Sequence, residues 1–257
     1  MYVSLFDYPW FLGAGLFFSL FIALDLGYRL ASRNRANSDP AHHEQIVSLR
    51  DGMLLLLTFL VGFTFAMALS RYDHRGALLV EEANAIRAAS LHARMLPEGQ
   101  QAELMELLRQ YADSRMELFE AGLDVRRRQA ALRRADQLQG RLWDASVAIG
   151  HRDDSPTFVE FMLALNDAIG LADKRLAAKE NRIPFITWAL IVFIALCASF
   201  TAGYSLEKPF WLLSVALPLT ISVTFSLIAD LDAPSSGFTG TGYATTARLQ
   251  QYLHSDR

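Results

Sequence analysis

Hydrophobic residues gather into two pairs of long runs, one pair near each end of the chain, separated by a strongly charged stretch of more than a hundred residues. The runs cover about 8–31, 52–70, 184–204 and 209–229. Each is close to the ~20 residues that an α-helix needs to cross ~30 Å of hydrocarbon. Since lipid offers no partner to backbone N–H and C=O groups, each span is predicted to be helical. A water-soluble core built from all four runs is the much weaker alternative.

The charged stretch, 71–183, has helical periodicity throughout and no strand-like alternation. The predicted fold class is all-α, with four transmembrane helices, a helical extramembrane bundle inserted between the second and third, and a C-terminal tail at 230–257. The first and last bundle helices run on from spans two and three with little interruption, so we expect long helices that leave the bilayer and pack outside it. The predicted helices are Arg75 to Met95, Glu98 to Ala121, Asp124 to Gly150 and Pro156 to Arg182.

Local signals set the helix boundaries. Pro97 ends the first bundle helix, and Gly122 suits the left-handed C-terminal cap of the second. Ser155-Pro156 predicts an N-cap followed by proline at the first helical position. Only about four residues, Ser205 to Lys208, connect spans three and four, which predicts an antiparallel hairpin, and Pro218 predicts a kink in span four.

Composition changes this picture little. Hydrophobic residues make up 52% of the chain, and the net charge of −3 gives no basic surplus that would indicate a nucleic-acid partner. The single cysteine, Cys197, excludes an intrachain disulfide and argues against a cysteine-built metal site. The N-terminal run has no basic flank or cleavage site of the kind that marks a removable signal peptide.

Span two carries two neighbouring faces of opposite character. Small residues at four-residue spacing let helices approach closely in lipid, and a bulky ridge beside them either faces lipid or is turned toward a shared axis by packing of subunits. A ring of such ridges would form a hydrophobic constriction, which gates ions by dewetting. The bulky set is Leu55, Phe59, Phe63 and Met67, and the small set is Thr58, Gly62, Ala66 and Ser70.

Charged residues near the spans have two interpretations each. Asp25, an acid in the last turns of span one, is either a functional intramembrane group or one half of a simple helical pair with Arg29, four residues later. Glu81 and Glu82 would ring a vestibule in a symmetric oligomer and favour cations, or they lie on a solvated helix face.

The central arginine run allows an anion or lipid-headgroup site, although interleaved acids favour a solvated face. His42-His43-Glu44 is too compressed for a defined metal site, and no motif supplies a nucleophile with a base or a phosphate-binding loop. We therefore expect no enzyme activity, no metal and no cofactor. The arginines are Arg126, Arg127, Arg128, Arg133 and Arg134, with Asp124 and Asp136 between them.

The segment TFLVGFTFAMALSRYD, at 58–73, resembles the second transmembrane helix of bestrophins. Thr58, Phe59, Gly62, Phe63 and Arg71 stand at matching places. The wider chain resembles the bacterial bestrophin-like family. That likeness rests on SRYDHR at 70–75, VEEANAI at 80–86, NRIP at 181–184 and DLDAPSSGF at 230–238.

The resemblance implies a homo-oligomeric ion channel, a pentamer, whose neck is formed by Leu55, Phe59 and Phe63. Leu56 replaces a proline of bestrophins, and the acidic run that binds calcium in bestrophins is missing after Asp232, so we expect no calcium clasp. Its expected partners are the lipid bilayer, other copies of the chain and inorganic ions, with no nucleic acid.

The implied location is the bacterial inner membrane as a multi-pass protein, with the helical domain cytoplasmic. Basic residues flank both ends of the spans, so the positive-inside rule does not decide the orientation. The second function that the sequence allows is a membrane-anchored sensor or scaffold, whose helical bundle binds a ligand or partner and conducts nothing.

Overall fold

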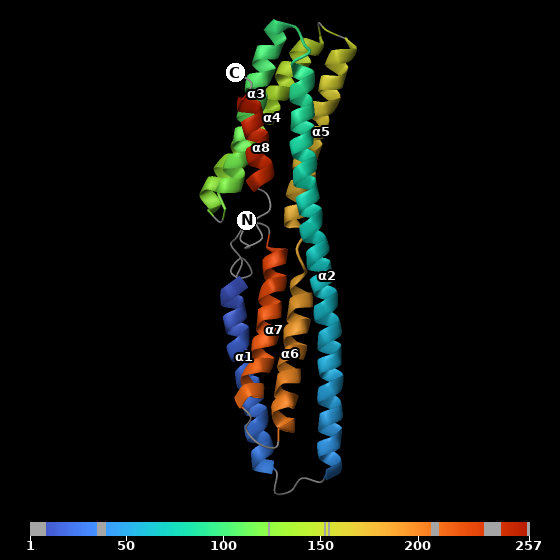
Figure 1. Cartoon of the computed structure of the whole chain (residues 1–257), viewed down its shortest axis with the longest axis vertical. Coiled ribbons are helices and arrows are strands. Elements are labelled where there is room, and N and C mark those ends of the chain that lie inside the picture. The colour runs from blue at the N-terminus through green and yellow to red at the C-terminus, as the bar shows by residue number, and fades with distance from the viewer. Residues whose placement is uncertain are drawn as a thin grey trace. The chain divides into compact units, whose positions relative to one another are not determined.

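The computed structural model describes residues 9–34, 40–122, 124–151, 153, 155–206, 211–233 and 243–255, and every regular element in them is an α-helix (Figure 1). Four helical stretches are long and apolar enough to cross a membrane: Trp10–Arg33, His43–Ala93, Pro156–Ser205 and Ser214–Asp232. The all-α class is confirmed, and the chain is a multi-pass membrane protein. The start of span one, the second half of the 205–208 loop and most of the DLDAPSSGF motif lie outside the described residues.

The chain forms two compact units. One comprises residues 4–71 and 182–237 and is called the membrane unit here. The other comprises residues 1–3, 72–181 and 238–257 and is called the helical unit. The helix α2 (Pro40–Ala93) is 54 residues long and contributes its first part to the membrane unit and its second part to the helical unit.

In the membrane unit, α1 (Pro9–Asn34) packs against both α6 (Phe185–Ser205) and α7 (Trp211–Asp232) (Figure 1). The contact between α1 and α6 depends on glycine. A Cβ atom on Gly203 would lie 1.9 Å from the Leu24 carbonyl oxygen, and one on Gly27 would lie 2.1 Å from that of Phe200. Both helices therefore use glycine to bring their backbones together, as small residues do in lipid. Helix α7 continues through Pro218.

A polar contact in the membrane unit fixes the segment before α6. The carboxylate of Asp232, the last residue of α7, accepts hydrogen bonds from the backbone N–H of Ile183 at 3.2 and 3.3 Å. Arg71 Nη1 lies 3.9 Å from the same carboxylate. The NRIP segment thus has a defined position and no helical structure. The sequence predicts two helices that follow each other here with little interruption, and in the structure α5 ends at Glu180 and α6 begins at Phe185.

The helical unit contains α3 (Glu98–Glu120), α4 (Val125–Gly150), α5 (Pro156–Glu180), α8 (Tyr243–His254) and the second part of α2. The capping signals act as predicted. Ser155 accepts a hydrogen bond from the Phe158 N–H with Pro156 in the first helical turn, and Gly122 has φ of 49°. Asp124 caps α4 by accepting hydrogen bonds from the N–H groups of Arg126 and Arg127 at 2.9 and 3.1 Å. The bounds of α3, α4 and α5 lie within two residues of those predicted.

Helix α8 lies in the stretch that the sequence pattern left as a tail, and it packs on α3. Leu249 and Leu253 enter the same hydrophobic core as Leu104, Leu108 and Phe161. Polar contacts reinforce the packing: Gln250 Nε2 donates to Asp113 at 2.8 Å, His254 Nε2 lies 3.0 Å from the same carboxylate, and Arg109 Nε donates to the Leu253 carbonyl at 2.9 Å. The guanidinium group of Arg87 lies 4.6 Å from the centre of the Tyr252 ring. The C-terminal helix is therefore a structural part of the helical unit.

Candidate functional site

Helix α2 has one buried stripe and one uncovered apolar face within the membrane unit. Leu57, Thr64 and Ala68 are buried. On the opposite side, Leu55, Phe59 and Phe63 are 73%, 68% and 65% exposed. In a helix with 3.6 residues per turn, Thr64 and Ala68 lie on the same side as Leu57, because they follow it by seven and eleven residues. Leu55 and Phe59 each lie two residues from Leu57, which places them on the opposite side. The three predicted neck residues therefore share a face that no part of the described chain covers.

The small residues of α2 lie on the same uncovered side. Thr58, Gly62, Ala66 and Ser70 are all exposed, and a Cβ atom added to Gly62 would meet no atom within 4 Å. The chain thus uses the glycines of α1 and α6 for its internal packing and leaves those small residues of α2 uncovered.

Side-chain contacts hold α2 against α6. Arg50 Nη1 donates to Ser205 Oγ at 3.0 Å. Thr201 Oγ1 lies 3.8 Å from Met53 Sδ. Arg50 and Met53 stand near the start of span two, so these contacts set the side of α2 that turns inward and, with it, the side that stays uncovered.

The two glutamates that the sequence paired have different environments. Glu81 is exposed, whereas Glu82 is 1% exposed. Arg115 Nε lies 2.6 Å from Glu82 Oε1, and Arg115 Nη2 donates to Oε2 at 3.2 Å. Arg175 Nη1 also contacts Oε2. Glu82 therefore joins α2 to α3 and α5 inside the helical unit, which differs from both the vestibule face and the solvated face that the sequence allows.

This ion cluster was detectable in principle. Glu82 precedes Ile86, Ala89 and Ala93 at spacings of four, seven and eleven, and those three residues belong to the buried core. A glutamate on the core stripe of a helix requires a buried cationic partner. The sequence does not say which of 24 basic residues supplies it, because the partners come from other helices.

Burial shifts the proton affinity of groups around Glu82. It raises the pKa of Tyr111, whose hydroxyl accepts a hydrogen bond from Gln139 Nε2 at 3.0 Å. It lowers the pKa of Arg175, an effect that the Glu82 carboxylate opposes. Burial, together with repulsion by Arg175 and Arg115, lowers the pKa of Lys179 to about 7. All these groups lie in the helical unit, outside α1, α6, α7 and the apolar part of α2.

The other charged candidates have simple surroundings. Asp25 pairs with Arg29 at 2.7 Å, one turn apart on α1, and both side chains are exposed. This pair explains the acid in span one without a special role. Among the residues whose side chains the structure describes, no three of His, Cys, Asp or Glu lie close enough to hold a metal ion. His42 has no described side chain, so the predicted absence of a site there is not tested.

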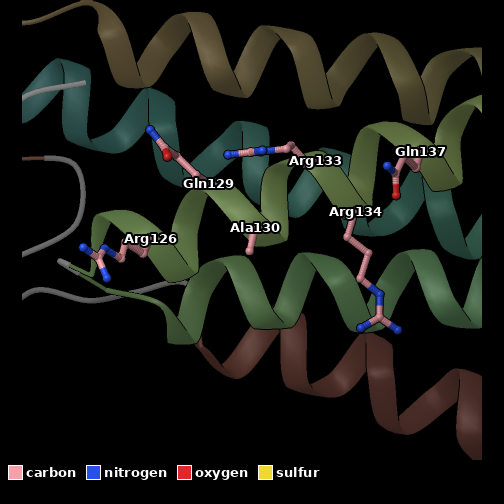
Figure 2. A pocket seen from close by; sticks show the side chains of 6 residues that line it. All are labelled: Arg126, Gln129, Ala130, Arg133, Arg134 and Gln137. Atoms are coloured by element: carbon pink, nitrogen blue, oxygen red, sulfur yellow. The ribbon is translucent and has the colours of Figure 1, made fainter.

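The arginines of α4 line a shallow surface hollow of about 630 Å³ (Figure 2). Figure 2 shows that the side chains spread along the helix: Arg126 lies at one end of the row, and Arg134 reaches toward α3. Arg134 Nη1 pairs there with Glu117 at 3.1 Å. Arg127 and Arg128 do not line the hollow, and Arg128 Nη2 instead donates to the Gly122 carbonyl. The predicted run is therefore divided among an ion pair, a helix end and solvent.

Comparison with known proteins gives one finding. A family model described as a bestrophin-like domain matches residues 15–244, which include most of the first apolar stretch, all of the other three, and the helical unit from its part of α2 to the first residues of α8. No curated protein and no solved structure matches the chain.

Proposed function

Since the chain belongs to the bestrophin-like family, we propose that it is a homo-oligomeric ion channel in which α2 of each subunit lines a central pore. The proposal rests mainly on the uncovered face of α2. Leu55, Phe59 and Phe63 are the most exposed apolar residues on the side opposite the stripe that packs in the membrane unit. In an oligomer, the small residues beside them give a neighbouring copy room to approach and turn these three side chains toward the axis.

The three residues form a hydrophobic neck in this proposal. They recur every four positions, so they follow the helix axis for about 12 Å at 1.5 Å per residue. Aliphatic and aromatic walls offer no ligands to replace the water around an ion, and such a neck controls ion passage by wetting and dewetting. Glu82 is bound by two arginines, so the vestibule charge that we propose reduces to Glu81.

The number of subunits and the topology are further parts of the proposal. Five subunits follow the bestrophin resemblance, and native mass spectrometry in detergent measures the number directly. We propose that the protein lies in a bacterial inner membrane with its helical unit in the cytoplasm. A cysteine placed at Glu98 in a Cys197→Ala background should then resist a membrane-impermeant thiol reagent in intact cells. Labelling of that cysteine would reverse the topology.

Ion flux in liposomes tests the channel. The double substitution Phe59→Ala and Phe63→Ala truncates two of the three neck side chains in every subunit. Water then persists in the neck, and ion flux increases or loses its gating. Phe193 on α6 is 63% exposed and supplies a matched control, because its truncation removes an equally exposed ring away from α2. Equal flux from the double variant, the Phe193→Ala control and the unchanged protein would contradict the neck. Absence of flux under all conditions would favour the sensor or scaffold.

A further inference from the structure

The interior of the helical unit holds more cationic groups than its carboxylate balances. Glu82 contacts Arg115 and Arg175, and Lys179 follows Arg175 by one turn on α5. We call these four residues the buried charge cluster. With each group in its usual charged form, the cluster carries two positive charges in excess. An unbalanced buried charge is costly, so the excess has to be removed or compensated.

Lys179 is the least compensated member of the buried charge cluster. The charges that act on it most strongly are Arg175 on its own helix, Arg115 on α3 and Arg128 on α4, and all three repel it. Glu82 on α2 attracts it and is already shared by two guanidinium groups. Within the described residues, the ammonium group of Lys179 has no hydrogen bond or ion pair. The phenol of Tyr111 also faces the cluster, hydrogen-bonded to Gln139.

Two chemical routes relieve this excess. Lys179 can release its proton, for which its pKa of about 7 leaves it poised at neutral pH. Alternatively, an anion can enter beside it and supply the missing negative charge. The Lys179 side chain is partly exposed, which leaves a route to it from solvent, whereas Glu82 and Arg115 are buried.

We propose that the buried charge cluster is a binding site for a small inorganic anion such as chloride, held by Lys179 with support from Arg175. The anion takes the place of a second carboxylate. The arginine row of Figure 2 is a poorer site, because its side chains are exposed and spread along α4. The proposal concerns the interior of one helical unit and holds whether or not the protein conducts ions.

Anion binding at this site is linked to proton binding. The anion prefers the protonated form of Lys179, so its apparent affinity falls by about tenfold for each pH unit above the pKa of that lysine. The site is therefore filled below pH 7 and is progressively emptied above it.

The test measures the melting temperature of the full-length protein in detergent, in sodium chloride and in sodium gluconate at equal ionic strength. At pH 6, chloride raises the melting temperature by about 3–6 °C when present at ten times its Kd. At pH 8.5 the affinity is about 30-fold lower, so the difference falls below about 1 °C. A chloride effect that is absent at pH 6, or equal at both pH values, would overturn the proposal.

Three variants assign the effect to Lys179. Lys179→Met shows no chloride effect at pH 6 or at pH 8.5, because no ammonium is left to hold the anion. Lys174→Met, the matched control at an exposed position of α5, keeps the effect of the unchanged protein. Lys179→Arg keeps it at both pH values, because the guanidinium does not titrate in this range. A chloride effect that persists in Lys179→Met places the anion elsewhere and refutes the site.

Discussion

Glu82 provides the most direct perturbation of the helical unit. Substitution with glutamine keeps the shape of the side chain and removes the charge that two arginines share. Glu82 is 1% exposed and Arg115 is 8% exposed, so the positive charges left behind stay out of water. Breaking a buried ion pair by removing one partner costs about 3–5 kcal/mol. For a chain of this length, that predicts a fall in melting temperature of about 6–20 °C.

The neighbouring residue supplies the control. Glu81→Gln makes the same chemical change at an exposed position, where a substitution shifts stability by less than about 0.5 kcal/mol. Both variants are purified in detergent and melted in parallel at pH 7, in gluconate, so that no chloride compensates the loss. If the melting temperature of Glu82→Gln lies within about a degree of that of Glu81→Gln, then the buried ion pairs of Glu82 with Arg115 and Arg175 do not stabilise the helical unit. A change in ion selectivity without a change in stability would instead support the vestibule role expected from sequence.

Three further predictions concern other parts of the chain. Gly203→Val forces a side chain against the Leu24 carbonyl and disrupts folding of the membrane unit. A Cβ atom at Gly62 would meet no atom within 4 Å, so Gly62→Val leaves the single chain folded and weakens the oligomer. Thermal melting reports the first effect and native mass spectrometry the second. Leu253→Ala loosens α8 and costs about 2–5 kcal/mol, against almost no cost for the exposed Gln251→Ala; equal melting temperatures would contradict the packing of α8 on α3. In gluconate, stability increases as pH rises from about 7 toward the usual lysine pKa, because across that window the unfolded chain holds the Lys179 proton and the folded chain does not. Lys179→Met removes this increase, and a persisting slope would assign it to another group.

The sequence predicts most helices because their boundaries depend on local chemistry. Ser155-Pro156 and Gly122 mark ends that the structure places within one or two residues, since caps satisfy the backbone where they stand. The position of segment 181–184 is not predictable from local sequence, because its contact, from the Ile183 N–H to the Asp232 carboxylate, joins residues far apart in the chain.

Interactions between distant segments were the main source of differences. The glycines that join α1 to α6 were not singled out, since Gly27 and Gly203 lie in different spans and neither repeats at a fixed spacing. Helix α8 was not predicted, because its 12 residues gain most of their stability from a core formed by other helices. Glu82 was paired with Glu81 by proximity in the chain, although its partners come from α3 and α5.

The neck residues illustrate the opposite case. A single chain leaves Leu55, Phe59 and Phe63 uncovered, and the sequence pattern alone marks them as a ridge. Neither the sequence pattern nor the structure of one chain shows what covers these residues, because the covering surface belongs to lipid or to other copies of the chain. The function therefore depends on a measurement in the assembled protein.

Disulfide cross-linking in native membranes tests the central claim, that α2 faces a shared axis. In a Cys197→Ala background, cysteines replace Phe59 or, as the matched control, Phe193 on α6. If the neck lies on the axis, cysteines at Phe59 from different copies approach closely, and mild oxidation yields cross-linked dimers at that position and none at Phe193. Cross-linked dimers from Phe193→Cys with none from Phe59→Cys would place α6 at the contact between copies and contradict the pore that we propose for α2.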